Sequence, residues 1–159
     1  RTRRLRILME LKQLISSDSI ICNAEVNSKK RALELMGELL SKKSGTSNPI
    51  EIFQQLTERE NLGSTALGHG VALPHARTNL CKEATGAFLK LDHGIDFDSP
   101  DKQPTDLLFA LMVPEDYTDE HLQILATLAG LFNEESFCNT LRSASSSTEI
   151  HDTLTTWQP

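Results

Sequence analysis

The sequence feature that most constrains the fold is the segment TDLLFALMVP at residues 105–114, in which an unbroken apolar run follows Asp106. Strands exposed on one face alternate apolar and polar side chains, whereas a near-continuous apolar run is typical of a strand buried on both faces of a sheet. Such a strand requires other elements packed on both of its sides. The segment therefore predicts a layered α/β arrangement.

Five other stretches have the apolar spacing and the end signals of helices. We expect helices over residues 29–43, 49–61, from 119 or 120 to 132, 134–144 and 146–157. Ser28 is a good N-cap for the first helix, and Gly45 supplies its stop. Asn48 as N-cap and Pro49 at the first helical position mark the start of the second.

Short apolar runs between the second and third helices predict strands over residues 71–74, 85–91, 95–97 and 105–114. Strands in mixed order among helices indicate an α/β fold, a mixed β-sheet covered by helices. The length of 159 residues suits one domain with one core. We expect a single domain over residues 1–159, with a basic and flexible end at residues 1–6.

The formal net charge of −6 argues against nucleic acid as the main partner, because affinity for phosphate backbones depends on clustered Lys and Arg. The exception is RTRRLR at residues 1–6, followed by ILMELKQLI, which could form a short basic amphipathic helix. Two interpretations stay open for this end, a frayed terminus or weak attachment to an anionic surface. With no 18-residue apolar stretch, we expect neither membrane insertion nor a secretory signal, and a cytoplasmic protein.

The cysteines Cys22, Cys81 and Cys138 are widely separated and form no CxxC pair. This spacing favours reduced structural thiols over a disulfide framework or a zinc site. The alternative is a reactive thiol at Cys81 beside Lys82, which would need a lowered pKa.

The segment GHGVALPHART at residues 68–78 places His75 directly after a proline. Pro74 has no N–H and a fixed φ, so strand pairing stops there and the next side chain is held at a strand end. Such a position favours a functional histidine. The same pattern is also compatible with a histidine that only finishes a strand.

The second candidate is His121, which lies in the first turn of the third helix if Thr118 or Asp119 is the cap. Free N–H groups and the positive end of the helix dipole attract anions there and disfavour the imidazolium. We expect His121 to be neutral, exposed and able to donate one hydrogen bond to a phosphate. The alternative is a histidine tolerated on a surface turn.

Together these segments resemble the mannitol/fructose-type enzyme IIA family of the bacterial phosphoenolpyruvate-dependent phosphotransferase system. The resemblance rests on TERENLGSTALGHGVALPHA at 57–76, DLLFALMVPED at 106–116 and HLQILATLAGLF at 121–132. NSKKRALELMGELL at 27–40 is similar to the nitrogen-regulatory (IIA-Ntr) branch. The likeness extends over residues 6–155, and it implies the fold of that family.

The resemblance also implies roles for individual residues. The histidine of the family's PH pair carries a phosphoryl group and corresponds to His75. The histidine that opens the later helix assists it and corresponds to His121, and the arginine of the REXXXST motif corresponds to Arg59. Ser64 and Thr65 would add hydrogen-bond donors around the phosphoryl oxygens. His69 falls at a variable place in the family's segment, and we take it as a bystander near enough to modulate the site.

The implied partner is a phosphorylated HPr-like carrier protein (NPr), with no cofactor and no metal. Regulated targets implied by the branch are potassium transporters or sensor kinases, which would contact a face formed by Leu67, Val71, Leu73 and Arg59. Three alternatives stay open: a sugar-transport relay that passes phosphate to a IIB domain, a non-phosphorylated sensor domain, and a metal hydrolase using His69, His75 and His121. The hydrolase lacks the HxH or HExxH spacing of metal sites.

Overall fold

The apolar segment from which the fold was predicted forms strand β6, Thr105–Pro114, which lies inside a mixed sheet. The computed structural model describes residues 11–46, 48–117 and 119–157. Its other strands are β1 (Ile20–Ala24), β2 (Ala66–Gly68), β3 (Val71–Ala72), β4 (His75–Thr78) and β5 (Thr85–Ile95). The strand order is β1-β5-β6-β3-β2, and β4 pairs with β6 beyond the end of β3. Strands β5 and β6 are antiparallel, whereas β3 and β4 run parallel to β6.

The helices begin and end close to the predicted positions. They are α2 (Lys29–Ser44), α3 (Pro49–Leu62), α4 (Asp119–Phe132), α5 (Glu135–Ser143) and α6 (Ser147–Thr156), with a short 3₁₀ turn η1 (Ser17–Ser19) before β1. The Ser28 side chain caps α2 by accepting from the Arg31 N–H, and Gly45 ends the helix with φ of 76°. Asn48 is the N-cap of α3, although its side chain makes no cap hydrogen bond.

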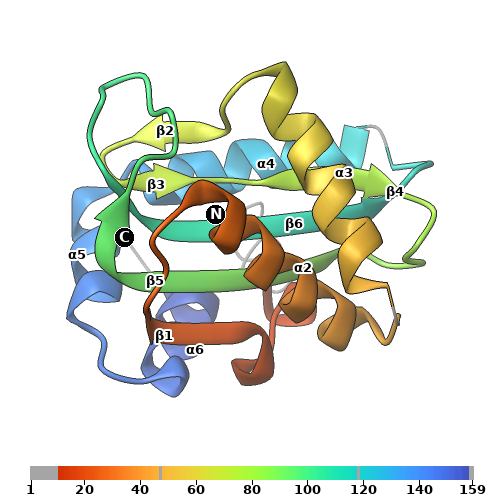
Figure 1. The fold of residues 1–159 in the computed structure, drawn as a ribbon. Helices are drawn as coiled ribbons and strands as arrows, with labels where there is room; N and C mark the ends of the chain where they lie inside the picture. The colour runs from red at the N-terminus through yellow and green to blue at the C-terminus, as the bar shows by residue number, and fades with distance from the viewer. Residues whose placement is uncertain (1–10, 47, 118, 158–159) are drawn as a thin grey trace.

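The helices cover both faces of the sheet, as predicted from β6 (Figure 1). Alternate side chains of β6 enter two separate cores because successive residues of a strand point to opposite faces. Leu108 and Met112 pack with α2 and α3, whereas Leu107 and Phe109 pack with α4, α5 and α6. This arrangement confirms the predicted mixed sheet covered by helices.

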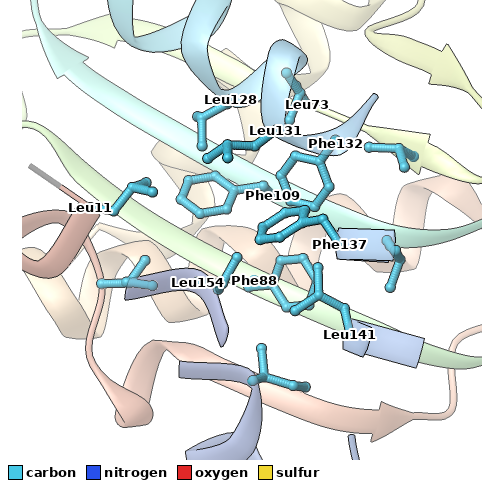
Figure 2. Packing of buried hydrophobic residues seen from close by; sticks show 14 of the residues in the cluster. Leu11, Leu73, Phe88, Phe109, Leu128, Leu131, Phe132, Phe137, Leu141 and Leu154 are labelled. Carbon is cyan, nitrogen blue, oxygen red and sulfur yellow. The ribbon is translucent and has the colours of Figure 1, made fainter. Parts of the chain in front are cut away.

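The core on the α4–α6 side is built around aromatic rings (Figure 2). Phe132 at the end of α4 lies between Phe88 of β5, at 6.1 Å between ring centroids, and Phe137 of α5, at 5.2 Å. All three rings are buried. They fix the end of α4 against the sheet.

Three strands were not predicted from the sequence: β1, β2 and β4. The predicted strand over residues 95–97 was wrong, because Ile95 is the last residue of β5 and Asp96 and Phe97 lie outside any strand. His75 was expected at the end of a strand, but it is the first residue of β4. The break at Pro74 is real, and pairing resumes at once because the Leu111 N–H donates to the Pro74 carbonyl at 2.9 Å.

The basic residues 1–6 lie outside the described residues, as do residues 7–10, the first part of the segment ILMELKQLI. The part that is described, residues 11–15, is helical at 11–14, and Leu11, Leu14 and Ile15 are buried in the core with β5 and β6. These apolar side chains are therefore not available to a membrane surface. Among the described residues, no helix combines the length and the apolar character needed to cross a membrane.

The three cysteines are free thiols. Burial raises the pKa of Cys81 to about 11, so its thiol is protonated at neutral pH despite the neighbouring Lys82. This result contradicts the alternative of a reactive thiol at Cys81.

Candidate functional site

The candidate site is a cleft of about 710 Å³ where strand β4 passes between helices α3 and α4. It is lined by Gln55, Glu58, Arg59, Leu62, His75, Ala76, Arg77, His121, Leu122 and Leu125. Helix α3 covers one face of the sheet and α4 the other, so the cleft brings together side chains from both layers and from the strand between them. Three of the predicted site residues, Arg59, His75 and His121, meet here.

His75 is held by hydrogen bonds at both ring nitrogens. Its Nδ1 lies 2.9 Å from the Leu73 carbonyl oxygen, and its Nε2 lies 3.2 Å from Nε of Arg59. A carbonyl oxygen only accepts and the guanidinium only donates, so these partners assign the proton to Nδ1 and the lone pair to Nε2. The ring is thereby prepared to attack an electrophile through Nε2.

Arg59 reaches His75 from the last turn of α3. Its Nη1 donates to the Gly63 carbonyl at 2.8 Å, which closes the end of that helix and directs the guanidinium toward β4. Arg59 is flanked in the sequence by Glu58 and Glu60, and the charge run alone would favour a surface ion pair, which these contacts do not match. In the ion pair that Glu60 forms, the cation is Lys29.

His121 occupies the first turn of α4, as expected, and its ring stands edge-on to that of His75 with 5.3 Å between centroids. The expectation that it is exposed was wrong, because only 7% of its surface is accessible. Its Nε2 is buried, and among the described residues it has no hydrogen-bond partner. The prediction failed because the first turn of α4 folds against β4, which sequence spacing does not reveal.

Both histidines are neutral at physiological pH. The pKa of His121 is lowered from 6.5 to about 4, mainly by burial and in smaller part by the nearby His75, Arg77 and Arg59. Burial also lowers the pKa of His75, partly opposed by its hydrogen bond to Leu73, and Arg59 adds to the lowering. Neutral His121 was expected from the helix dipole, whereas burial is the largest cause in the structure.

Ser64 and Thr65 do not line the cleft. The Ser64 hydroxyl donates to the Phe97 carbonyl at 2.7 Å, and the Thr65 hydroxyl donates to the Glu60 carboxylate. Both hydroxyl protons are therefore used elsewhere. A role of these two residues in holding phosphate stays a prediction without support from this arrangement.

His69 lies far from the cleft, which corrects the expectation that it is near enough to modulate the site. Its N–H donates to Asp101 and its carbonyl accepts from Arg142, which also pairs with Asp106 at the start of β6. His75 is opposite Leu111, five residues after Asp106 on β6, so at about 3.3 Å per strand residue the two histidines are roughly 16 Å apart. Three histidines therefore do not converge, which contradicts the metal-hydrolase alternative.

The cleft contains residues that the sequence interpretation missed. Arg77 is two residues after His75 on β4, and the period of two in a strand would have placed it on the same face. Gln55 is one turn before Arg59 on α3, and its Oε1 is buried with no hydrogen-bond partner among the described residues.

The apolar rim of the cleft also differs from the prediction. Leu62 is 85% exposed and Leu122 is 66% exposed, and both line the cleft. Val71 and Leu73, which were expected at the surface, are buried, and Leu67 lies outside the cleft. The exposed leucines are thus on the helices that flank His75.

Comparison with known proteins agrees with this architecture. The model of the family described as "Phosphoenolpyruvate-dependent sugar phosphotransferase system, EIIA 2" matches residues 13–157. The nitrogen regulatory protein of Klebsiella oxytoca is 38% identical over 148 residues, which cover 92% of this chain and 91% of that protein.

Solved structures give the same result. The nitrogen regulatory protein IIA-Ntr from Neisseria meningitidis aligns with a TM-score of 0.86 and 42% identity, over 91% of this chain and 99% of that chain. Escherichia coli IIA mannitol, solved in complex with phosphorylated IIB mannitol, aligns with a TM-score of 0.75 and 23% identity over 88% of this chain and 96% of that chain. The second match shows a shared fold. The predicted family resemblance and the predicted enzyme IIA fold are confirmed.

Proposed function

Because this chain belongs to the EIIA 2 family of the phosphoenolpyruvate-dependent sugar phosphotransferase system, we propose that it is a phosphocarrier that accepts a phosphoryl group on His75. The nitrogen regulatory proteins among its relatives support a regulatory role. In this proposal the phosphorylation state of the protein is a signal in the cytoplasm, rather than one step of sugar uptake.

The observation that carries the proposal is the orientation of His75. Nδ1 is tied to the Leu73 carbonyl, so the lone pair of Nε2 is directed toward the cleft and toward Arg59. Burial lowers the pKa of the ring, which keeps Nε2 unprotonated at neutral pH. A neutral imidazole with one fixed tautomer is what nucleophilic attack on phosphorus requires.

In the proposed step, Nε2 of His75 attacks the phosphorus of a phosphohistidine on an HPr-like carrier protein (NPr). The N–P bond of the carrier breaks as the new N–P bond forms, and the carrier's nitrogen leaves with the electron pair. The His75 ring gains positive charge, which strengthens its Nδ1–H hydrogen bond to Leu73. No proton, metal or nucleotide has to enter this exchange.

The surrounding groups would stabilise the transferring phosphoryl group, whose charge spreads over its equatorial oxygens. Arg59 offers N–H groups beside Nε2. The buried Nε2 of His121 has no hydrogen-bond partner within the described part of the chain, and as a neutral imidazole His121 can donate one hydrogen bond to a phosphoryl oxygen. Arg77 adds a second positive charge to the same cleft.

Phosphorylation adds roughly two negative charges at neutral pH. On His75 these charges would lie between the exposed leucines Leu62 and Leu122. A partner that packs against the uncharged cleft would lose contacts, so the unmodified and phosphorylated forms would bind different proteins. We expect potassium-transport proteins or sensor kinases among the partners, by analogy with the nitrogen-regulatory branch.

The second candidate is a sugar relay, in which His75 passes its phosphoryl group to a IIB domain. It is favoured by the IIA mannitol structure, which was solved in complex with a phosphorylated IIB. The higher identity of the nitrogen regulatory relatives leads us to prefer the regulatory role. The alternative of a sensor domain that is never phosphorylated gives no role to the fixed tautomer of His75 and its Nε2 lone pair.

Incubation with radiolabelled phosphoenolpyruvate, enzyme I and an HPr-like carrier tests the proposal. We expect a label on the wild-type protein that is lost in acid and stable in alkali, as phosphoramidates are, and no label on His75→Ala. Label that persists on His75→Ala would refute the assignment, and an unlabelled wild type would favour the sensor domain. Pull-downs with wild type and His75→Ala, with and without phosphorylation, then test whether the two forms bind different proteins, as a signal requires. A relay would instead pass its label rapidly to a IIB domain.

A further inference from the structure

We infer that Glu60 is the positioning residue of this site: its carboxylate holds the backbone that orients Nδ1 of His75, and it lies beside the arginine that contacts Nε2. The inference rests on the proposed function, since it concerns how His75 is prepared for phosphoryl transfer. Glu60 does not line the cleft, so it acts through other groups.

Glu60 is a buried carboxylate with several partners. Only 2% of its side chain is exposed. Its oxygens accept the Thr65 N–H at 3.2 Å and the Thr65 hydroxyl, and Oε2 lies 3.0 Å from Nζ of Lys29. A buried charge is tolerated only when it is paired and hydrogen-bonded, and these contacts meet that condition.

A continuous chain of hydrogen bonds leads from Glu60 to Nδ1 of His75. The carboxylate binds the N–H and the hydroxyl of Thr65. The Thr65 carbonyl accepts the Leu73 N–H at 3.1 Å. The Leu73 carbonyl then lies 2.9 Å from Nδ1 of His75. The position of the acceptor that fixes the tautomer therefore depends on where Glu60 holds Thr65.

The other ring nitrogen of His75, Nε2, is contacted by a residue from the same turn of α3. Arg59, adjacent to Glu60, binds Nε2 of His75 and the Gly63 carbonyl, while the Gly63 N–H donates to the Glu60 carbonyl at 3.1 Å. Glu60 thus fixes the end of α3 through its backbone and the start of β2 through its side chain. These contacts explain the motif REXXXST: the arginine contacts the reacting nitrogen, and the glutamate and threonine hold the backbone around it in place.

Lys29 secures the carboxylate from the first turn of α2. Its Nζ also lies 3.1 Å from Asp98 and 4.7 Å from the ring centroid of Phe97, whose carbonyl accepts the Ser64 hydroxyl. Residues 64 and 65 are therefore anchored twice, by Phe97 and by Glu60. This arrangement gives Ser64 and Thr65 a structural use that differs from holding phosphate.

The experiment measures the tautomer of His75, which does not depend on phosphorylation. In ¹⁵N-histidine-labelled wild type at pH 8, we expect the two ring nitrogens of His75 to have widely separated shifts, with the proton on Nδ1. In Glu60→Gln, which removes the charge at constant size, we expect the separation to shrink as both tautomers become populated. Phosphoryl transfer from the phosphorylated carrier should fall about tenfold or more, since a misplacement of ~1 Å can cost ~10²-fold.

Two comparisons make the result specific. Glu51→Gln removes a charge from an exposed position of the same helix and should keep the wild-type shifts and rate. Lys29→Arg should preserve the His75 shifts and the transfer rate, because it keeps the cation. Lys29→Met should reduce the separation of the shifts and the transfer rate, as Glu60→Gln does. Should Glu60→Gln fail to fold, Lys29→Met and Thr65→Val give the same two readouts.

A purely structural Glu60 would lower the unfolding temperature and leave the His75 shifts and the transfer rate unchanged, which would overturn the inference. The proposed function fails separately, if the folded wild type takes no label. A shift change in Glu60→Gln together with an unlabelled wild type would support the positioning role and refute the phosphocarrier.

Discussion

Nε of Arg59 donates a hydrogen bond to Nε2 of His75 across 3.2 Å, so the nitrogen that carries the lone pair is paired with a permanent cation. The two residues are 16 positions apart and belong to different layers, helix α3 and strand β4. Burial lowers the pKa of His75 and the charge of Arg59 adds to that lowering, and the contact leaves N–H groups next to the place where a phosphoryl group would arrive.

Arg59→Lys should fold normally but transfer phosphate more slowly. An ammonium group provides positive charge without the planar fork that contacts His75 and Gly63 together. Loss of one charge-stabilising donor typically costs about 10²-fold to 10³-fold in rate. Rapid-quench measurement of transfer from the phosphorylated carrier checks this. A wild-type rate in Arg59→Lys would show that only the positive charge of Arg59 matters for transfer.

His121→Ala should slow phosphoryl transfer and also reduce stability. Because the ring is buried against His75, its removal leaves a cavity, and we expect a loss of about 1 to 2 kcal/mol in the free energy of unfolding. Urea unfolding at pH 7.5 measures the stability, and His151→Ala on α6, outside the cleft, serves as the control. Unchanged transfer in a folded His121→Ala protein would leave the ring with a packing role only.

Stability should fall as the pH drops from about 6.5 toward 4. The pKa of His121 is about 4 in the folded state and near 6.5 when unfolded, so in this window the unfolded chain binds more protons and acid favours unfolding. The His121 contribution is on the order of 3 kcal/mol, fully present above pH 6.5. The lowered pKa of His75 acts in the same direction. The difference in stability between pH 5 and pH 7.5 should therefore be smaller in His121→Gln than in the wild type, and an equal difference in both proteins would contradict the assignment.

Leu122→Asp should weaken docking of the carrier. The leucine is 66% exposed at the rim of the cleft, and a carboxylate there would lose apolar contact and repel an incoming phosphoryl group. We expect the carrier concentration at half-maximal rate to rise about tenfold or more, equivalent to ~1.4 kcal/mol. Ile50→Asp is a matched control, because Ile50 is 72% exposed on α3 but does not line the cleft. Equal effects of the two variants would argue against docking at this rim.

Much of the fold could be predicted from the sequence, because it depends on local patterns. Ser28 and Gly45 delimit α2 through capping and backbone conformation, both properties of a few neighbouring residues. The apolar run in β6 required cover on both faces, which two helical layers provide. Strands β1 and β4 were missed because they are short and pair with strands far along the chain, and β2 was missed because it has only three residues.

The candidate site likewise has some features that the sequence predicts and others that depend on the tertiary structure. The sequence by itself determined that His75 follows a proline and that His121 opens a helix, and the motifs around them indicated the family. Only the tertiary structure decided that His121 is buried, that His69 is remote, and that the hydroxyl of Thr65 is bound to Glu60. The physical reason is that burial, pKa and hydrogen-bond partners depend on which residues the packing of α3, β4 and α4 brings together, and residue spacing along the chain does not encode those distances.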